Sequence, residues 1–313
     1  KDSLMKKISI VTPTFNEEEN IERLCKEIKI EAETLNYDYE HIIIDNCSTD
    51  KTIDKLREIS SADKNVKVII NSRNYGHIKS PFYGVLQSTG DACILMVSDF
   101  QEPINLISQY IKKWENGAKI VLGEKNVSEE NNFMFSLRKL FYKSLNKISE
   151  TKLSINTTGT GLFDKEVINR LKKINDPYPY FRGLISEIGF DIETIKFDQP
   201  LRKFGVTKNN FFTLYDLAML GVVKHSRIPL RIMTLLGFLS SFGCLLVAIV
   251  YLILKLFFWN SFELGSAPTI IGIFTISSIQ IMLLGLLGEY IGVILLHQRN
   301  MPLVIEKERI NFN

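Results

Sequence analysis

One stretch decides the fold: Ala92-Cys93-Ile94-Leu95-Met96-Val97, followed by Ser98-Asp99-Phe100-Gln101-Glu102-Pro103. An apolar run of this length, closed by polar residues and a proline, is typical of a buried parallel strand. Ligands of open α/β sheets bind beyond the carboxyl ends of the strands. Asp99 and Gln101 therefore present two oxygen donors of the kind that hold Mg²⁺ or Mn²⁺ on a diphosphate. An acidic cap for the next helix is the alternative, because Glu102-Pro103 is also a fair helix start.

Three further strands are predicted before this stretch, at residues 8–11, 41–44 and 66–70, each followed by a polar loop and a helical pattern. This alternation predicts an α/β fold with a parallel, doubly wound sheet. A single polar loop is ordinary turn chemistry, but four at one edge of a sheet are typical of a nucleotide site. No glycine-rich phosphate fingerprint is present, which disfavours dinucleotide-binding and P-loop enzymes.

The composition favours an enzyme at a membrane over a nucleic-acid-binding protein. The chain has 313 residues, 45% of them hydrophobic, and a formal net charge of only +3. This length allows one catalytic domain with additional elements, and so weak a charge predicts no nucleic-acid partner. The charged N-terminus leads directly into the first strand, so we expect no signal peptide. The cysteines lack metal-ligand spacing and are expected to stay reduced; they are Cys25, Cys47, Cys93 and Cys244.

Two long uncharged stretches, residues 232–254 and 267–288, predict a transmembrane hairpin, with a pair of buried core helices as the alternative. Basic residues flank this hairpin and are absent from the loop around Trp259. The positive-inside rule then places the catalytic domain and both termini in the cytoplasm, at the inner membrane. Four parts are predicted: a catalytic domain (1–210), an amphipathic juxtamembrane segment (211–231), the hairpin (232–296) and a cytoplasmic tail (297–313).

Seven motifs resemble, in order, those of family 2 glycosyltransferases with the GT-A fold. Each motif alone is weak, but the ordered set covers nearly the whole chain. The last three resemble the polyprenyl-phosphate branch, which includes bactoprenol glucosyltransferases and dolichyl-phosphate mannose synthases. The motifs are Thr12-Pro13-Thr14-Phe15-Asn16-Glu17-Glu18, Asp45-Asn46-Cys47-Ser48-Thr49-Asp50, Arg73-Asn74-Tyr75-Gly76, Asp99-Phe100-Gln101-Glu102-Pro103, Tyr180-Phe181-Arg182-Gly183-Leu184, Arg202-Lys203-Phe204-Gly205-Val206-Thr207-Lys208 and Gly288-Glu289-Tyr290-Ile291-Gly292.

The resemblance implies transfer of a sugar, with inversion, from a UDP- or GDP-linked donor to a polyprenyl phosphate in the membrane. It implies Mg²⁺ or Mn²⁺ as cofactor, held by Asp99 and Gln101, and a homotetramer as the assembly. Asp45 is expected to accept a hydrogen bond from the donor base, in a pocket shaped by Pro13, Phe15 and Glu17. The remaining candidates are phosphate-binding residues: Arg202 and Lys208 as catalytic cations, with Lys125, Arg138 and Thr207 as weaker contacts of acceptor or diphosphate.

Two departures from the family pattern bear on activity. Val97 stands where the family usually has the first Asp of Asp-x-Asp, and Asp45-Asn46-Cys47-Ser48 replaces Asp-Asp-Gly-Ser. A degenerate relative that binds nucleotides as a membrane-anchored regulator therefore remains an alternative, as does a structural adaptor. A polysaccharide-extending synthase is a third alternative, although two membrane helices cannot readily enclose a channel.

The acceptor is predicted from a missing base. Transfer to a sugar hydroxyl needs a general base, and Thr158-Gly159-Thr160-Gly161-Leu162-Phe163 contains no acidic residue before Asp164. A phosphate monoester needs no base, because its second pKa is about 6 and it is largely dianionic at pH 7. The sequence therefore predicts a phosphate acceptor, and no proton-transfer role is assigned to His77.

Overall fold

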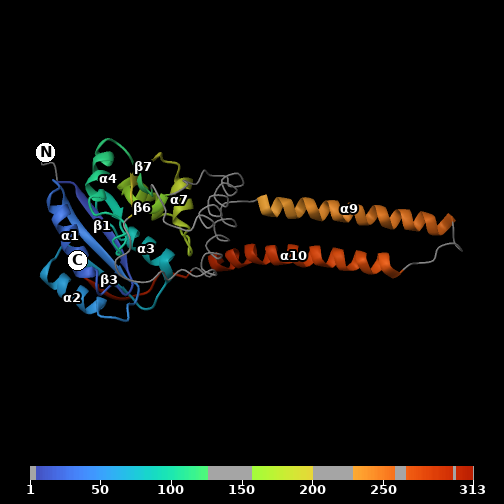
Figure 1. The fold of residues 1–313 in the computed structure, drawn as a ribbon, viewed down its shortest axis with the longest axis horizontal. Coiled ribbons are helices and arrows are strands. Elements are labelled where there is room, and N and C mark those ends of the chain that lie inside the picture. Colours follow the sequence, from blue (N-terminus) through green and yellow to red (C-terminus); the bar gives the residue numbers. More distant parts are fainter. Residues whose placement is uncertain (1–4, 126–156, 200–227, 258–265, 299–300, 313) are drawn as a thin grey trace.

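The structure is a computed structural model that describes residues 5–125, 157–199, 228–257, 266–298 and 301–312. Figure 1 shows an α/β part from which two long helices extend side by side. Several predicted features lie outside the described residues. They are Arg138, Arg202, Thr207, Lys208 and the amphipathic segment that precedes the first long helix.

A mixed sheet of eight strands forms the centre of the α/β part, in the order β7-β5-β6-β4-β1-β2-β3-β8. The predicted strands are all present, with slightly different ends. The strands are β1 (Lys7–Thr14), β2 (Asp38–Asp45), β3 (Val66–Asn71), β4 (Ala92–Leu95), β5 (Ile120–Lys125), β6 (Thr157–Asp164), β7 (Ile192–Phe197) and β8 (Glu306–Ile310).

The prediction of a parallel sheet is confirmed for β1 to β4 and wrong for the whole sheet. Strand β1 pairs in parallel with both β2 and β4, and β2 with β3. Strand β6 instead runs antiparallel to β4 and β5, and β8 antiparallel to β3. The β8 pairing covers the exposed edge of β3, whose backbone N–H and C=O groups would otherwise be unpaired. The local sequence pattern does not indicate that β6 pairs with β4 and β5, or that β8 pairs with β3.

Helices cover both faces of the sheet. Buried side chains of α1, α2 and α4 pack on one face, and those of α3, α6 and α7 on the other. Strand β2 serves both layers, because Ile43 points into the first and its neighbours Ile42 and Ile44 into the second. The helices are α1 (Ile21–Glu33), α2 (Thr52–Ala62), α3 (Gly76–Leu86), α4 (Leu106–Glu115), α6 (Lys165–Leu171), α7 (Phe181–Ile188), α9 (Ile228–Phe257) and α10 (Ser266–Gln298).

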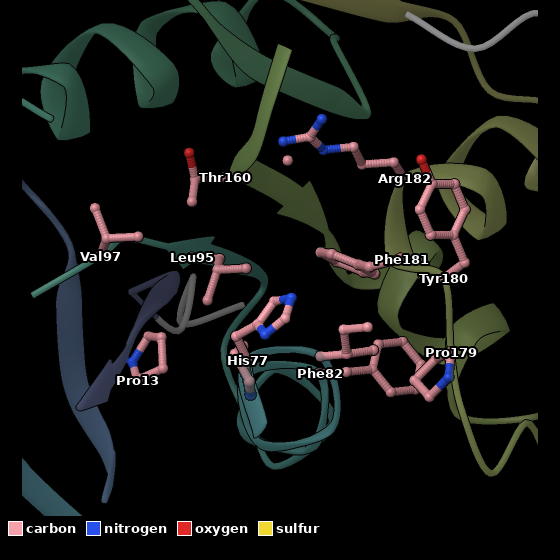
Figure 2. A pocket seen from close by; sticks show the side chains of 13 residues that line it. Pro13, His77, Phe82, Leu95, Val97, Thr160, Pro179, Tyr180, Phe181 and Arg182 are labelled. Atoms are coloured by element: carbon pink, nitrogen blue, oxygen red, sulfur yellow. The ribbon is translucent and has the colours of Figure 1, made fainter. Parts of the chain in front are cut away.

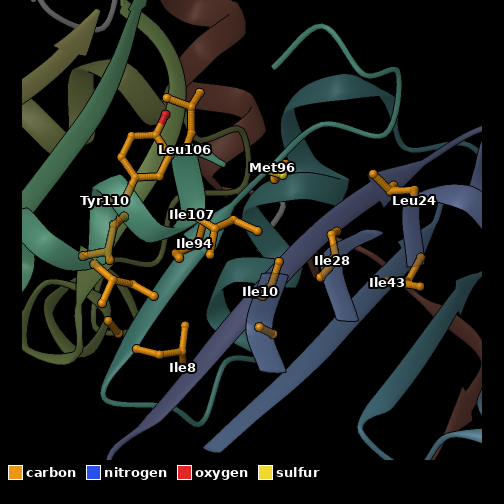
Figure 3. Packing of buried hydrophobic residues seen from close by; sticks show 14 of the residues in the cluster. Ile8, Ile10, Leu24, Ile28, Ile43, Ile94, Met96, Leu106, Ile107 and Tyr110 are labelled. Carbon is orange, nitrogen blue, oxygen red and sulfur yellow. The ribbon is translucent and has the colours of Figure 1, made fainter. Parts of the chain in front are cut away.

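The first of these layers is a continuous apolar core (Figure 3). Ile10 and Ile94 of adjacent strands lie beneath Ile28 of α1 and Ile107 of α4, and all four are fully buried. Complete burial of such a side chain stabilises the fold by about 1.5–3 kcal/mol. Burial of both sheet faces explains why the strands are continuous apolar runs and not alternating patterns.

The C-terminal segment, predicted as a tail, is built into the α/β part. Arg57 on α2 forms a 2.7 Å ion pair with Glu308, and the hydroxyl of Tyr83 on α3 donates a 2.9 Å hydrogen bond to Glu306. The amide of Asn311 donates to the backbone carbonyl of Val66, 2.8 Å away. Strand β8 therefore ties the end of the chain to the sheet that carries the strand-end loops.

Helices α9 and α10 contain the predicted spans, residues 232–254 and 267–288. Large apolar side chains on both helices are exposed, including Phe238 (73%) and Ile281 (70%). In the part of the chain that the structure describes, no helix is both long enough and apolar enough to cross a membrane. The transmembrane hairpin stays a prediction.

Candidate functional site

The candidate site lies at the carboxyl edge of strands β1 to β4. The parallel register places Thr14 opposite Asp45, and Asp45 opposite Ile70. The loops that follow these strands therefore start at the same edge of the sheet. This is the convergence that the sequence predicts, and it brings the candidate donor-binding residues into one region.

Asp45 organises the first two loops. Its carboxylate is fully buried and accepts hydrogen bonds from the backbone N–H of Ser48 (2.8 Å), the hydroxyl of Ser48 (2.5 Å) and the hydroxyl of Thr14 (3.3 Å). The Ser48 hydroxyl in turn accepts from the backbone N–H of Asn16, 2.8 Å away. Burial raises the pKa of Asp45, and the bonds from Ser48 oppose this rise. The predicted contact of Asp45 with a donor base stays a prediction.

Further bonds join the loop after β1 to the loop after β2. The Asn16 side chain accepts from the backbone N–H of Thr49 (2.8 Å), and the backbone N–H of Glu17 donates to the hydroxyl of Thr52 (2.9 Å). The carboxylate of Glu17 accepts from the amide of Asn20 at 2.7 Å. Glu17 and Asp45, two of the residues expected to bind the donor nucleotide, thus belong to one hydrogen-bonded frame.

Asn46 organises the third loop, a role that sequence reasoning missed. Its amide nitrogen donates to the side-chain oxygen of Asn74 (2.8 Å) and to the carbonyl of Gly76 (3.2 Å). Its amide oxygen accepts from the backbone N–H of Tyr75 (2.8 Å) and from the amide of Asn71 (3.2 Å). An ionised carboxylate could only accept. The departure from the usual Asp at this position therefore matches the surrounding donors and acceptors.

Four non-glycine residues among those described adopt the left-handed backbone conformation. One is Asn311, which follows β8, and the other three follow strands of this edge. They are Asn16 after β1 (φ 56°), Cys47 after β2 (φ 65°) and Phe100 after β4 (φ 55°). A side chain costs about 1–2 kcal/mol in this conformation, which Gly adopts freely. Such strain gathers at functional sites. It also explains why the family usually has Gly where this chain has Cys47.

Asp99 and Gln101 lie on the turn after β4. The backbone N–H of Gln101 donates to the Asp99 carboxylate at 3.2 Å, and both residues are partly buried. Among the described residues there is no group of three or more His, Cys, Asp and Glu that could hold a metal ion. One carboxylate and one amide oxygen nevertheless fit a hard cation that takes its other ligands from substrate phosphates and water. Lys125, at the end of β5, is partly buried.

A pocket of about 230 Å³ opens beside this turn (Figure 2). Most of its lining side chains are apolar. His77 lies at the margin of the pocket and keeps an exposed surface. Partial desolvation of its imidazole lowers the pKa of His77. Of the residues expected to bind the donor nucleotide, only Pro13 lines the pocket. The wall at the start of α7 is formed in part by Tyr180, Phe181 and Arg182, which belong to a motif noted in the sequence. The lining residues are Pro13, His77, Ile78, Pro81, Phe82, Leu95, Val97, Gly159, Thr160, Pro179, Tyr180, Phe181 and Arg182.

Comparison with known proteins places this arrangement in a family. The family model for glycosyl transferase family 2 matches residues 9–172. The chain belongs to this family. Among the relatives of this family 2 glycosyltransferase is the bactoprenol glucosyl transferase of Shigella phage SfX, 31% identical over 305 residues that cover 97% of this chain and 99% of the relative. The prophage bactoprenol glucosyl transferase homolog of Escherichia coli K12 is also 31% identical, with 96% and 98% covered.

A solved structure supports the GT-A fold. Glucosyl-3-phosphoglycerate synthase from Mycobacterium tuberculosis, crystallised with Mn²⁺, UDP and phosphoglyceric acid, matches 70% of this family 2 enzyme and 76% of its own chain. The TM-score is 0.50 and the sequence identity 18%, so the likeness concerns the fold alone.

The bonds of Asn46 predict that Asn46→Asp, which restores the usual family sequence, destabilises this enzyme. A carboxylate would lose both donor bonds and face the oxygens of Asn74 and Gly76. We expect unfolding to need about 1–3 kcal/mol less free energy at pH 7, measured by urea unfolding of the purified protein. Asn169→Asp, on the exposed side of α6, is the control and should change little. Equal or higher stability of Asn46→Asp would contradict the assigned hydrogen bonds.

The left-handed backbone of Cys47 predicts that Cys47→Gly raises the free energy of unfolding, in contrast to Asn46→Asp. Glycine removes the strain but makes the unfolded chain more flexible, so we expect a net gain of about 0.5–1 kcal/mol in the free energy of unfolding. Cys47→Ala keeps the strain and should show no such gain. The same urea titration measures both, and a loss of stability in Cys47→Gly alone would overturn the account.

Proposed function

We propose that this glycosyltransferase moves a sugar from a nucleotide-sugar donor to polyprenyl phosphate at a membrane surface. The observation that carries the proposal is the Asp99-Phe100-Gln101 turn, whose two oxygen donors stand beside the joined loops at the carboxyl edge of the sheet. The near-full-length similarity to proteins named bactoprenol glucosyl transferase supports a lipid-carrier acceptor.

The proposed reaction is one displacement with inversion. An oxygen of the polyprenyl phosphate attacks the anomeric carbon, a new carbon–oxygen bond forms, and the bond from that carbon to the nucleoside diphosphate breaks. The leaving diphosphate takes the electron pair of the broken bond. The attacking oxygen already carries a negative charge at pH 7, so no proton has to be removed. Activity is expected to fall on the acid side of about pH 6, where the lipid phosphate becomes protonated.

The described residues supply positioning and charge. Asp99 and Gln101 would hold a divalent cation, Mg²⁺ or Mn²⁺, which neutralises charge on the leaving diphosphate. The frame built by Asp45 and Asn46 fixes the loops against which the donor nucleotide binds. Arg202 and Lys208, with Lys125, Arg138 and Thr207 as further contacts, are proposed to bring the two negatively charged phosphates together.

We also propose that α9 and α10 anchor the enzyme in the cytoplasmic membrane, with the α/β part and both termini in the cytoplasm. The exposed apolar side chains of both helices and the basic residues that flank them support this placement. Association of the helices into a homotetramer remains an expectation from the family resemblance.

The turnover experiment uses the purified full chain with undecaprenyl phosphate, Mn²⁺ and a panel of UDP- and GDP-sugars. We expect a lipid-linked sugar phosphate with one donor, and no product with polyprenol that lacks phosphate. Asp99→Asn should lower kcat about 10²–10³-fold, because a charge-stabilising group at the leaving diphosphate is lost. Asp54→Asn, on the exposed side of α2, is the matched control.

Two results would contradict this proposal. Full activity of Asp99→Asn would contradict the assignment of Asp99 as a ligand of the divalent cation. Donor binding in isothermal titration without any turnover would favour the nucleotide-binding regulator instead.

The topology has its own test. With the four native cysteines replaced, a cysteine at Ser261 should react with an impermeant thiol reagent added outside intact cells, because the loop between the helices lacks basic residues. A cysteine at Asn313 should react only after the cells are permeabilised. Labelling of position 313 from outside would refute the cytoplasmic placement of the C-terminus.

A further inference from the structure

The pocket beside the Asp99 turn has two walls and a floor from distant parts of the chain. The floor is formed by the ends of β1, β4 and β6, and the walls by α3 and by the segment that leads into α7. In Figure 2, Arg182 extends from the α7 side toward Thr160, and His77 lies on the α3 side. Val97 lines the floor only two residues before Asp99, so the pocket adjoins the proposed position of the donor diphosphate.

The wall on the α7 side is a fixed aromatic surface. The Phe181 ring packs edge-on against Phe82, with ring centroids 5.5 Å apart, and lies 5.1 Å from the ring of Phe163. The ammonium group of Lys79 lies 5.3 Å from the ring of Tyr178, which joins α3 to the same segment. The apolar lining is thus held in place before any ligand binds.

A glycine leaves room for the charged side chain of the pocket. Gly159 has a φ of +81°, and a Cβ at this position would lie 3.0 Å from Nε and 3.3 Å from Cγ of Arg182. The arm of Arg182 therefore lies across backbone that carries no side chain. Among the lining residues, Thr160 already uses its hydroxyl as a donor to Glu102.

The lining selects an apolar ligand next to a negative charge. A sugar ring would place several hydroxyl groups against Val97, Leu95 and Phe82, and burial of hydroxyls without partners is unfavourable. A hydrocarbon meets no such cost and gains from leaving water. The volume is below the ~300–1,000 Å³ typical of pockets for drug-sized ligands, so it admits a fragment of a substrate. A valine at position 97, where the family usually has Asp, makes the floor apolar as well.

We infer that this pocket receives the first isoprene unit of the acceptor lipid, with Arg182 binding the phosphate that this unit carries. The inference rests on the proposed function, because the acceptor is the substrate whose hydrocarbon lies directly beside the reacting phosphate. Arg182 offers a planar fork that matches phosphate oxygens. Val97 and Phe181 then determine which acceptor is accepted, while Asp99 and Gln101 act on the donor.

Photolabelling tests the location without requiring turnover. The probe is farnesyl phosphate with a diazirine on its first isoprene unit, added to the full chain in detergent. After irradiation, we expect mass spectrometry to find the label on peptides that contain Ile78, Val97 or Phe181, and excess undecaprenyl phosphate to abolish it. Label confined to peptides outside the pocket would overturn the inference, even if sugar transfer is observed. Label in the pocket without transfer would overturn the proposed function instead.

Two substitutions test the lining. Val97→Thr keeps the volume but adds a hydroxyl, so the KM for undecaprenyl phosphate should rise about tenfold while the KM for the donor stays unchanged. Ile30→Thr makes the same kind of change at an exposed site on α1 and should have no effect. A rise in the donor KM alone would show that the pocket holds the sugar.

Arg182 is tested in the same assay. Arg182→Gln should raise the KM for the lipid phosphate about 10–100-fold, because a charge-assisted bond is lost, and Arg182→Lys should raise it less. An unchanged KM for the nucleotide sugar in both variants would show that the site is still folded. A KM for lipid phosphate unchanged in Arg182→Gln would refute the phosphate contact.

Discussion

A buried carboxylate sets the geometry of the candidate site. Asp45 has no exposed surface, and its bonds to Ser48 and Thr14 compensate for the cost of burying it. Through Ser48 it reaches the backbone of Asn16, so the loops after two neighbouring strands are fixed to each other. Pre-organised loops lose little conformational entropy when a substrate binds. The rest of the edge is built around this frame.

Three residues depart from the usual family sequence, and each departure has a different physical meaning. Asn46 is suited to its surroundings, because it donates and accepts at once and joins the third loop to the second. Cys47 is not suited in the same way, since its left-handed backbone favours glycine. Val97 is a third case, because it contributes to the apolar floor of the pocket. A departure from a motif therefore carries information only once its neighbours are known.

The proposed reaction assigns its two substrates to neighbouring parts of the carboxyl edge of the sheet. Polar loops and the Asp99 turn occupy one part of the edge, and an apolar pocket with Arg182 occupies the part between α3 and α7. Strand β8 returns the chain from α10 to the sheet and pairs with the edge of β3. The loop after β3 leads into α3. A proposed membrane anchor at α9 and α10 is thereby tied to the sheet through backbone hydrogen bonds and through ion pairs such as Arg57 with Glu308.

The sequence by itself determined the α/β class, the four parallel strands and the edge at which the polar loops meet. It could do so because burial on both faces leaves a continuous apolar run for each strand, and parallel strands end at the same edge. It also placed Asp99, Gln101, Asp45 and Glu17 at that edge. Tertiary structure alone decided the antiparallel positions of β6 and β8, the hydrogen bonds of Asn46 and the pocket that joins Val97 to Arg182. These features depend on contacts between residues far apart in the chain, which no local period or motif spacing encodes.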